Sequence, residues 1–309
     1  MRRIVTLTLN PALDVFTSTG RIVDSHKLRC EAPRFDPGGG GINVARVARR
    51  LGANTLAVFP SGGATGEHLH ALLQGEQVPC RRVPIAGETR ESFSVNEASS
   101  GREFRFVLPG PTLSDAEVQA CIAACAEEAG EGDWLVASGS LPPGAAPDVY
   151  ARLARATGAQ LAVDTSGGAL VAALAQGVAL VKPSLRELRE LTGEALPSQA
   201  EWLTACRELV THGHARMVAL SLGADGAMLV TGELALRAQA LQVSVASSIG
   251  AGDSFLAGLL VALQGTQDLK EAFATAMAAG AAALLEPGTA LCRPQDVAVL
   301  RGRVQVAVL

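Results

Sequence analysis

Short apolar runs alternate with helix-length segments along most of the chain. The runs are rich in β-branched residues, which predicts buried strands at 4–9, 56–59, 134–138, 161–164, 179–181 and 217–221. Helices are expected between them at 66–73, 114–128, 149–156, 169–175, 185–191 and 201–211, the second opening with the capping-box spacing of Ser114 and Glu117. Repeated strand-then-helix units with short loops predict an α/β fold, in which helices cover a largely parallel central sheet.

Two segments depart from this alternation and follow a two-residue period. In residues 15–35, weak alternation at 17–20 and 27–32 predicts thin strands, and residues 89–108 have the pattern of a hairpin around a turn at 99–101. We expect these segments to form a small separate β-sheet. Because a sheet with one apolar face must cover something, it is expected to act as a lid, a dimer surface, or both. The α/β core would then comprise residues 1–14, 36–88 and 109–309.

Composition narrows the class of protein. Of 309 residues, 48% are hydrophobic and 18% charged, with a formal net charge of −4, so the chain is globular and has no basic field that favours nucleic acid. The longest apolar helix candidate, 272–285, is too short to cross a bilayer, and the apolar run after Met1–Arg3 is too short for a targeting segment, so we expect a cytoplasmic protein without a membrane partner. No two of the six cysteines have Cys-x-x-Cys spacing, and neither His-x-His pair has metal-ligand partners beside it, which favours free thiols and no metal site at the histidines.

A glycine turn precedes the apolar helix candidate at 255–263. Gly250 and Gly252 allow a positive φ and a close approach of a ligand, and a helix N-terminus offers unpaired N–H groups to an anion. Asp253 falls in the first turn, where a carboxylate could take a proton from an attacking hydroxyl. The pattern therefore predicts a phosphoryl-transfer centre, and an ordinary Asp helix cap after a glycine turn is the alternative.

A second glycine run, Gly38 to Gly41, opens a helix that is expected to reach about Leu51. Its backbone could wrap a small polar ligand, and the Asn43 amide could bond to hydroxyl groups. The run matches neither the dinucleotide fingerprint nor the Walker A loop.

Polar residues also gather where predicted strands end. Asp14 is expected on the loop after the first strand, and the others in this group are Ser140, Asp164, Lys182, Ser184, Ser221 and Gly223. In an open α/β sheet the carboxyl ends of the strands form the ligand-binding edge. The sequence thus predicts a site there.

Five motifs occur in an order that resembles the ribokinase-like (PfkB) carbohydrate kinases along nearly the whole chain. They are Gly38–Ala45, Ser138–Gly144, Lys182–Ser184 with Glu187, Ser221–Gly223 with Gly226–Ala227, and Gly250–Asp253. The resemblance implies a ribokinase-like α/β core with a β-sheet lid, and an enzyme that phosphorylates a sugar phosphate with ATP as co-substrate.

Within this family, the resemblance at the four-glycine run and at 27–30 and 62–69 implies fructose 6-phosphate as the acceptor, phosphorylated at O1 to give fructose 1,6-bisphosphate and ADP. Tagatose 6-phosphate or fructose 1-phosphate is the alternative acceptor. An alternative of another class is a non-catalytic sugar-phosphate sensor, although a sensor has no need of the intact Gly250–Asp253 motif. A nicotinamide-linked dehydrogenase lacks its fingerprint.

The resemblance also implies a role for individual residues. Asp253 would be the catalytic base, with an anion hole made by Gly250, Ala251 and Gly252. The sugar hydroxyls would be held by Asp14, Gly39, Gly40 and Asn43, and the 6-phosphate by Arg90, Ser140 and Lys27, the last reaching in from the lid of a second subunit. ATP would be held by Lys182, Ser184, Ser221, Gly223 and Gly226. Glu187 would organise Mg²⁺ through water, and a monovalent cation such as K⁺ would lie at Ser247, Ile249, Ala283, Glu286 and Gly288.

Two positions depart from the family pattern. Ser184 stands where the family has Asn before the magnesium-organising Glu187, and its shorter reach predicts weaker Mg²⁺ organisation. Glu286 stands where relatives have Asn and Arg around the monovalent cation, so it could strengthen or abolish that site. The apolar alternation at 103–108 further predicts a homodimer formed through the lid.

Overall fold

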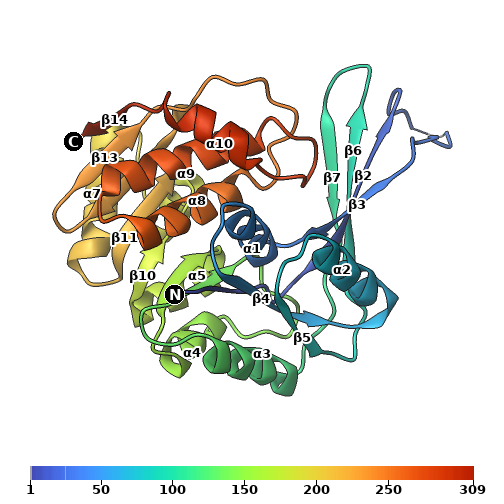
Figure 1. Cartoon of the computed structure of the whole chain (residues 1–309), viewed down its shortest axis with the longest axis horizontal. Coiled ribbons are helices and arrows are strands. Elements are labelled where there is room, and N and C mark those ends of the chain that lie inside the picture. The colour runs from blue at the N-terminus through green and yellow to red at the C-terminus, as the bar shows by residue number, and fades with distance from the viewer. Residues whose placement is uncertain (1, 25) are drawn as a thin grey trace.

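The computed structural model describes residues 2–24 and 26–309 and contains two sheets that differ in size (Figure 1). The large sheet has ten strands in the order β14-β13-β12-β11-β10-β9-β8-β1-β4-β5. The strands are β1 Ile4–Leu7, β4 Thr55–Ser61, β5 Cys80–Pro84, β8 Trp134–Ser138, β9 Gln160–Asp164, β10 Val178–Val181, β11 Ala215–Ser221, β12 Ala227–Thr231, β13 Ala235–Ala238 and β14 Val306–Val308. Every pair from β5 to β11 is parallel, which confirms the predicted largely parallel sheet.

One edge of this sheet is antiparallel. Strands β12, β13 and β14 pair antiparallel beyond β11. These strands and β5 were not predicted from the sequence. β14 is only three residues long and lies at the sheet edge, so its apolar pattern is too short to stand out.

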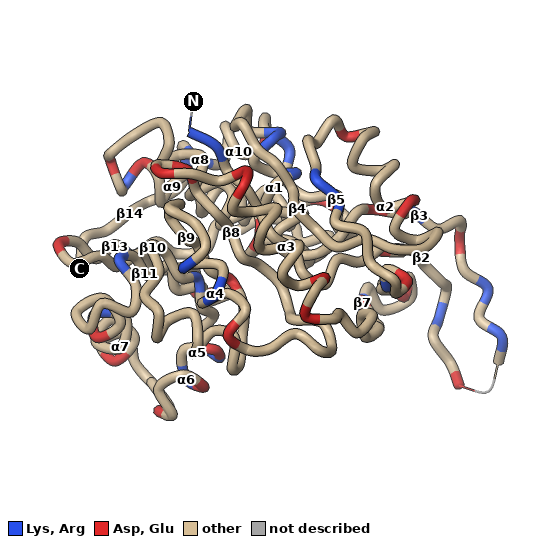
Figure 2. Tube along the Cα trace, turned by 90° about the horizontal axis from the view of Figure 1, so that it is seen from below, with Lys and Arg blue, Asp and Glu red and all other residues tan. Residues whose placement is uncertain are grey.

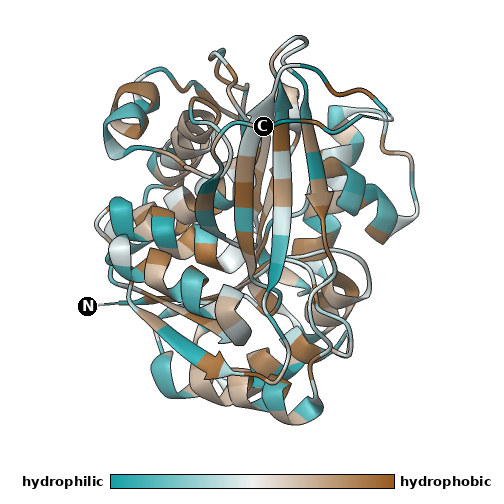
Figure 3. Ribbon diagram, turned by 90° about the vertical axis from the view of Figure 1, so that its right-hand side faces the viewer, coloured by the Kyte–Doolittle hydropathy of each residue, from teal (hydrophilic) through white to brown (hydrophobic). Residues whose placement is uncertain are grey.

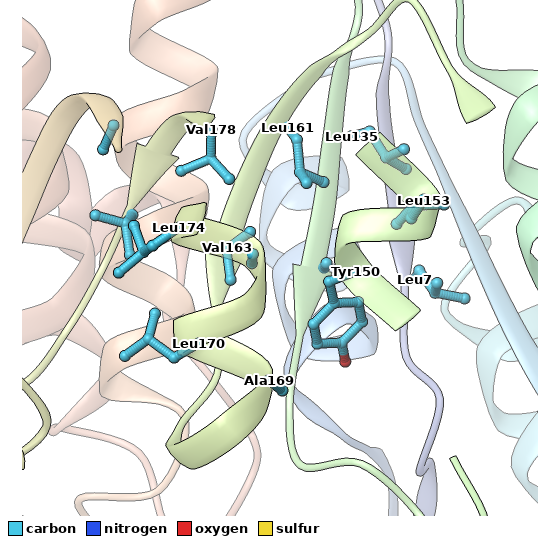
Figure 4. Close-up of a cluster of buried hydrophobic side chains, with 14 of the residues drawn as sticks. Leu7, Leu135, Tyr150, Leu153, Leu161, Val163, Ala169, Leu170, Leu174 and Val178 are labelled. Carbon is cyan, nitrogen blue, oxygen red and sulfur yellow. The ribbon is translucent and has the colours of Figure 1, made fainter. Parts of the chain in front are cut away.

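Helices cover both faces of the large sheet. One face carries α1 Gly40–Arg50, α8 Ala251–Gly265, α9 Leu269–Ala283 and α10 Pro294–Arg301, and the other α3 Asp115–Glu128, α4 Val149–Ala156, α5 Gly167–Gln176, α6 Leu185–Thr192 and α7 Gln199–Thr211. The strands alternate accordingly: Leu135 faces the second layer and Val136 the first. Figure 4 shows part of the hydrophobic core between the sheet and the layer of α3 to α7, where Leu153 of α4 and Leu170 of α5 lie against the strands.

Three helices begin with complete capping boxes. The predicted box of Ser114 and Glu117 is confirmed at the start of α3, and the same reciprocal bonds occur at Ser184 with Glu187 and at Ser198 with Glu201. Helix α2, Gly63–Gly75, packs against the small sheet. Among the residues that the structure describes, no helix is long and apolar enough to cross a membrane.

The small sheet extends to one side of the core (Figure 1). Its order is β3-β2-β6-β7, with β2 Ala12–Thr19, β3 Arg34–Gly38, β6 Arg90–Glu97 and β7 Glu103–Val107. The hairpin of β6 and β7 confirms the pattern seen at 89–108. Two expectations were wrong. Asp14 lies within β2 rather than on a loop, and residues 27–32 form no strand. This exposed stretch contacts β2 through scattered bonds, from the Glu31 N–H to Ser18 O at 2.9 Å and from Thr19 Oγ1 to Arg29 O at 3.0 Å, which do not make a continuous ladder.

The strand register gives the small sheet two different faces. Phe35, Val15, Phe93 and Phe106 lie opposite one another across its four strands, forming one apolar row. The other face carries Asp14, Ser92, Ser94 and Arg105 and is turned toward the core, where Glu103 of the same face accepts a hydrogen bond from Ser247. Figure 3 shows this alternation of hydrophobic and hydrophilic residues along the strands.

Candidate active site

Asp253 lies in the first turn of α8, at the end of the large sheet that faces the small one. Helix α8 begins after Gly250, which adopts the left-handed conformation with φ 75°, and a Cβ at this position would overlap the Leu291 side chain. No side chain caps this helix; the Asp253 carboxylate instead accepts a 2.9 Å hydrogen bond from Asn43 Nδ2. The simple helix-cap interpretation of Asp253 is therefore wrong.

The surroundings of Asp253 tune its acidity. Burial raises the pKa of Asp253 to about 6, and the negative charge of Asp164 acts in the same direction. The hydrogen bond from Asn43 and the charges of Lys182 and Arg105 lower it in part. The group is thus ionised at neutral pH and remains a better proton acceptor than a free carboxylate, as a general base requires.

Lys182 places a positive charge next to the start of α8. It follows β10, and its Nζ lies 3.1 Å from Oδ1 of Asp164, at the end of β9. Burial acts to lower the pKa of Lys182, but the Asp164 carboxylate outweighs it, so the pKa is raised and the amine stays protonated. A Cβ on Gly252 would lie 3.3 Å from Nζ, which puts the charge beside the free N–H groups of the first turn. An anion bound at this turn would contact both the Lys182 amine and these N–H groups.

The glycine run brings the backbone at the end of β3 against the strand ends of the core. Gly39 has φ 114°, and a side chain there would also lie 2.6 Å from Thr8 Cγ2. A Cβ on Gly40 would overlap Ser138 Oγ at the end of β8. Helix α1 starts at this point, so Asn43 in its first turn can reach Asp253.

Asp14 and Arg90 lie on adjacent strands of the small sheet. The Asp14 carboxylate fills the space that a side chain on Gly38 would need. Burial raises the pKa of Asp14 to about 6, while the charges of Arg105 and Arg90 lower it in part. Arg90 donates to the backbone oxygens of Leu108 at 3.0 Å and Asn10 at 3.1 Å, and its buried Nε has no partner. Asn10 in turn donates to Ser140 Oγ at 3.4 Å, so Arg90 and Ser140 belong to one group.

Arg105 was not predicted from the sequence to be a site residue. Its charge lowers the pKa of both Asp14 and Asp253, so it faces the same space as these two carboxylates. The signal was available, because Arg105 lies opposite Ser94 in the hairpin and therefore shares the face of β6 that meets the core. Lys27, by contrast, is exposed and lies between β2 and β3 in the chain. Figure 2 shows that this segment, which carries Lys and Arg residues, extends beyond the rest of the molecule.

The residues predicted to hold ATP lie at the ends of β10 and β11. Ser184 and Ser221 form an isolated bridge, and the Ser221 N–H donates to Pro183 O at 2.9 Å. A 3₁₀ turn from Gly223 to Asp225 follows β11 and closes at Gly226, where φ is 94° and a Cβ would overlap the backbone oxygen of Ala238. These positions therefore lie at the same strand ends as Lys182, which follows β10.

One carboxylate oxygen of Glu187 takes part in the capping box of α6. Its Oε2 accepts from the Ser184 N–H and hydroxyl, each at 2.8 Å, while Oε1 lies 3.9 Å from Arg186 Nη2. One oxygen is thus left to orient a water, which fits a water-mediated Mg²⁺ contact. Among the described residues, no cluster of three or more His, Cys, Asp or Glu is arranged to hold a metal directly. A magnesium ion here would rely on the phosphates and water for most of its ligands.

Glu286 is engaged by an arginine. Arg293 contacts both carboxylate oxygens, Nε to Oε1 at 2.8 Å and Nη2 to Oε2 at 2.9 Å. Such a two-pronged pair neutralises the added charge. Ligands for a monovalent cation would therefore come from the backbone oxygens of the surrounding loops, of which that of Ala283 already accepts from the Glu286 N–H at 3.2 Å.

Sequence comparison matches residues 13–296 to the pfkB family carbohydrate kinase model. The chain is 47% identical over 298 residues to the ATP-dependent 6-phosphofructokinase isozyme 2 of Mycobacterium tuberculosis, covering 96% of this chain and 88% of the relative. It is 43% identical over 300 residues to the Escherichia coli enzyme of the same description, covering 96% and 97%. The 1-phosphofructokinase of Rhodobacter capsulatus is 35% identical over 314 residues, covering 99% and 98%. The chain belongs to the pfkB family of carbohydrate kinases.

Solved structures of this family have the same fold as this chain. Phosphofructokinase-2 from Escherichia coli in complex with substrates and products matches with a TM-score of 0.94 at 42% identity, covering 97% of this chain and 99% of that one. The same protein in complex with potassium, and in a tetrameric inhibited form, matches with TM-scores of 0.94 and 0.93 at 42% and 41% identity, each over 98% of this chain and 99% of that one. A ribokinase from Arabidopsis thaliana, at 19% identity, shows the shared fold with a TM-score of 0.73 over 97% of this chain and 99% of that one. The ribokinase-like fold expected from the sequence is thus confirmed.

Proposed function

We propose that this chain is an ATP-dependent 6-phosphofructokinase, which transfers the γ-phosphoryl group of ATP to O1 of fructose 6-phosphate. The observation that carries the proposal is the hydrogen bond from Asn43 to Asp253, because it joins the glycine run to the proposed base at a helix N-terminus. Family membership supports the reaction, and the greater identity to 6-phosphofructokinases than to 1-phosphofructokinase supports the acceptor.

In this proposal the chain's own residues position charge and move one proton. The Asp253 carboxylate takes the proton of the acceptor hydroxyl, and its pKa of about 6 suits this task at neutral pH. The N–H groups of Gly250, Ala251 and Gly252 and the charge of Lys182 stabilise the transferring phosphoryl group, because phosphoryl transfer depends mainly on positioning and electrostatics.

The acceptor would lie between the glycine run and the small sheet. Asp14, Gly39, Gly40 and Asn43 would bind its hydroxyls. Arg90 and Ser140 would bind its 6-phosphate, and to these we add Arg105, since a guanidinium on this face suits a phosphate dianion. Lys27 would contribute from a second subunit, since within its own chain it is exposed on the segment between β2 and β3.

ATP would lie along Ser184, Ser221, Gly223 and Gly226. Mg²⁺, bound mainly to ATP phosphates and water, would be oriented by Glu187 and would neutralise phosphate charge. A potassium ion could bind backbone oxygens of Ser247, Ile249, Ala283 and Gly288, with the Glu286 carboxylate held by Arg293 instead of by the ion.

We also propose that the chain forms a homodimer through the apolar row of the small sheet, residues Phe35, Val15, Phe93 and Phe106. Phe106 is 53% exposed and Phe35 36% exposed in the single chain, so a second copy would cover them. The tetrameric form of the Escherichia coli relative supports an assembling surface in this family.

A coupled assay of ADP release with ATP and Mg²⁺ tests the function. Fructose 6-phosphate, tagatose 6-phosphate, fructose 1-phosphate and unphosphorylated sugars are compared by kcat/KM. We expect fructose 6-phosphate to be preferred. Preference for fructose 1-phosphate or tagatose 6-phosphate would overturn the acceptor assignment, and binding without turnover of any sugar would favour the sugar-phosphate sensor.

A further inference from the structure

Arg46 on α1 is the largest fully buried side chain among the residues that the structure describes. It lies one helical turn after Asn43, and its guanidinium bonds to groups from four parts of the chain. Nη1 donates to Pro37 O at 2.9 Å, Thr289 O at 3.1 Å and Asn43 Oδ1 at 3.4 Å, and Nε and Nη2 donate to the Glu76 carboxylate at 2.5–3.1 Å.

The contact with Asn43 has a chemical consequence. A side-chain amide offers an oxygen on one side and an NH₂ group on the other. A guanidinium has only donors and an ionised carboxylate only acceptors, so Arg46 must face the oxygen and Asp253 the NH₂ group. If the amide were reversed, donors would oppose donors at Arg46 and oxygen would oppose oxygen at Asp253. Arg46 and Asp253 therefore select the same orientation of Asn43.

We propose that Arg46 is a positioning residue for phosphoryl transfer: it fixes the Asn43 amide so that Nδ2 faces the Asp253 carboxylate, and it anchors this pair to the loop at Thr289 and to the end of α2 at Glu76. The proposal rests on the assignment of Asp253 as the proton acceptor. Arg46 touches neither substrate in this arrangement and acts through Asn43.

The charge balance fits this role. Burial acts to raise the pKa of Glu76, but the hydrogen bonds and charges of Arg46 and Arg50 outweigh it, so the pKa of Glu76 is lowered and its carboxylate is ionised against Arg46. Removing one partner of a buried ion pair destabilises the protein, because the other charge is left uncompensated. A purely structural Arg46 could therefore be replaced by Met with loss of stability alone, whereas a positioning Arg46 could not.

Arg50 provides a matched control. It lies one turn further along α1, donates to the same Glu76 carboxylate at 2.9 Å, and binds the same loop through Ala290 O at 2.5 Å. Its hydrogen bonds reach Glu76, Ala290 and Cys292, and none reaches Asn43. Replacing Arg50 by Met removes one partly buried positive charge, 27% exposed against 1% for Arg46, from the same helix without touching the amide.

The experiment compares R46M, R50M and R46K with the wild-type enzyme, using steady-state kinetics and thermal unfolding. We expect R46M to lower kcat about 10²-fold with KM for ATP little changed, as expected for a misplaced reacting group. R50M should keep kcat within about threefold, and its Tm should fall less than that of R46M, because Arg50 is 27% exposed and Arg46 only 1%. Equal losses of kcat in R46M and R50M would overturn the proposal.

The pH profile gives a second readout. The Asn43 hydrogen bond lowers the pKa of Asp253, and the other charged groups that face Asp253, namely Asp164, Lys182 and Arg105, are unchanged in R46M. The acid limb of kcat/KM should therefore move upward from about pH 6 in R46M and stay in place in R50M. R46K keeps both charge and approximate volume but cannot bond in several directions at once. Full recovery of kcat in R46K would mean that charge alone matters and would overturn the proposal.

A double-mutant cycle with N43A completes the test. If Arg46 acts through Asn43, adding R46K to N43A should cost no further activity. Independent, multiplying losses would contradict the proposal. A failure of the underlying base assignment would be recognised separately, because the D253N enzyme would then retain turnover whatever the behaviour of Arg46.

Discussion

The side-chain amide of Asn43 donates a 2.9 Å hydrogen bond to the carboxylate of Asp253, although the two residues lie 210 positions apart in the chain. Helices α1 and α8, which carry them, pack on the same face of the large sheet. The contact couples the end of the site that would hold the sugar to the end that would hold the phosphoryl group. Each end can be perturbed separately, which makes the assignments testable.

Replacing Asp253 by Asn should abolish turnover and spare binding. The amide has nearly the same shape and can still accept from Asn43, but it cannot take a proton. We expect kcat to fall by 10³-fold or more, near the range for loss of a general base, while fructose 6-phosphate and ATP still bind in calorimetry. Retention of most of the activity would disprove the base assignment.

The same substitution should stabilise the free enzyme at neutral pH. The pKa of Asp253 rises from 3.8 to about 6 on folding, so between these values the folded state binds the proton more tightly, and stability falls as pH rises through this window. Removing this penalty should add up to about 3 kcal/mol at pH 7.5 and about half of that at pH 5. Chemical denaturation of both proteins at the two pH values measures the difference. A gain independent of pH would show that titration is not its cause.

Arg105 should act on the acceptor and leave ATP unaffected. We expect R105Q to raise KM for fructose 6-phosphate by about 10- to 100-fold, the typical loss for a hydrogen bond to a charged group. Arg102 is the control on the same hairpin, since its guanidinium lies over the Phe104 ring and pairs with Glu97 at 3.8 Å. R102Q should leave both KM values within about twofold. Similar changes in the two variants would argue against a phosphate contact at Arg105.

Ser184 should combine a structural and a functional role. Because Ser184 and Ser198 cap their helices in the same way, S184A and S198A should each lose about 1 kcal/mol of stability. Only S184A should also change the Mg²⁺ concentration for half-maximal activity, because it frees Glu187 to move. S184N, which restores the family residue, should lower this concentration. If S184A leaves the Mg²⁺ response unchanged, Glu187 has no part in organising the ion.

Phe106 should hold the dimer together. We expect F106D to sediment as a monomer and to have a higher KM for fructose 6-phosphate, because Lys27 of the second subunit would be lost. Val107 is the control, being equally exposed at 57% but on the opposite face of β7. V107D should remain dimeric. A wild-type protein that is fully active as a monomer would contradict both the dimer and the role of Lys27.

Local pattern was enough to predict most of the core. Buried parallel strands are apolar on both faces, so β8, β9 and β11 stand out as short apolar runs, and the spacing of Ser114 and Glu117 is itself the capping box. The spacing of Ser184 and Glu187 is the same signal of a capping box, whereas the magnesium contact of Glu187 was implied only by the resemblance to the family. The glycine turn before Asp253 likewise predicts an anion site from neighbouring residues alone.

The sequence by itself thus determined the α/β class, the hairpin of the small sheet and the motifs of a carbohydrate kinase, because each depends on residues a few positions apart. Only the tertiary structure decided that Asp14 lies on a strand and that Arg293 holds Glu286. It alone joined Arg46, Asn43 and Asp253 into one chain of contacts. Such contacts depend on the order of the strands and the packing of the helices. The hydrophobic effect that brings these segments together is not directional, so the local pattern predicts which residues are buried but not which distant residues they contact.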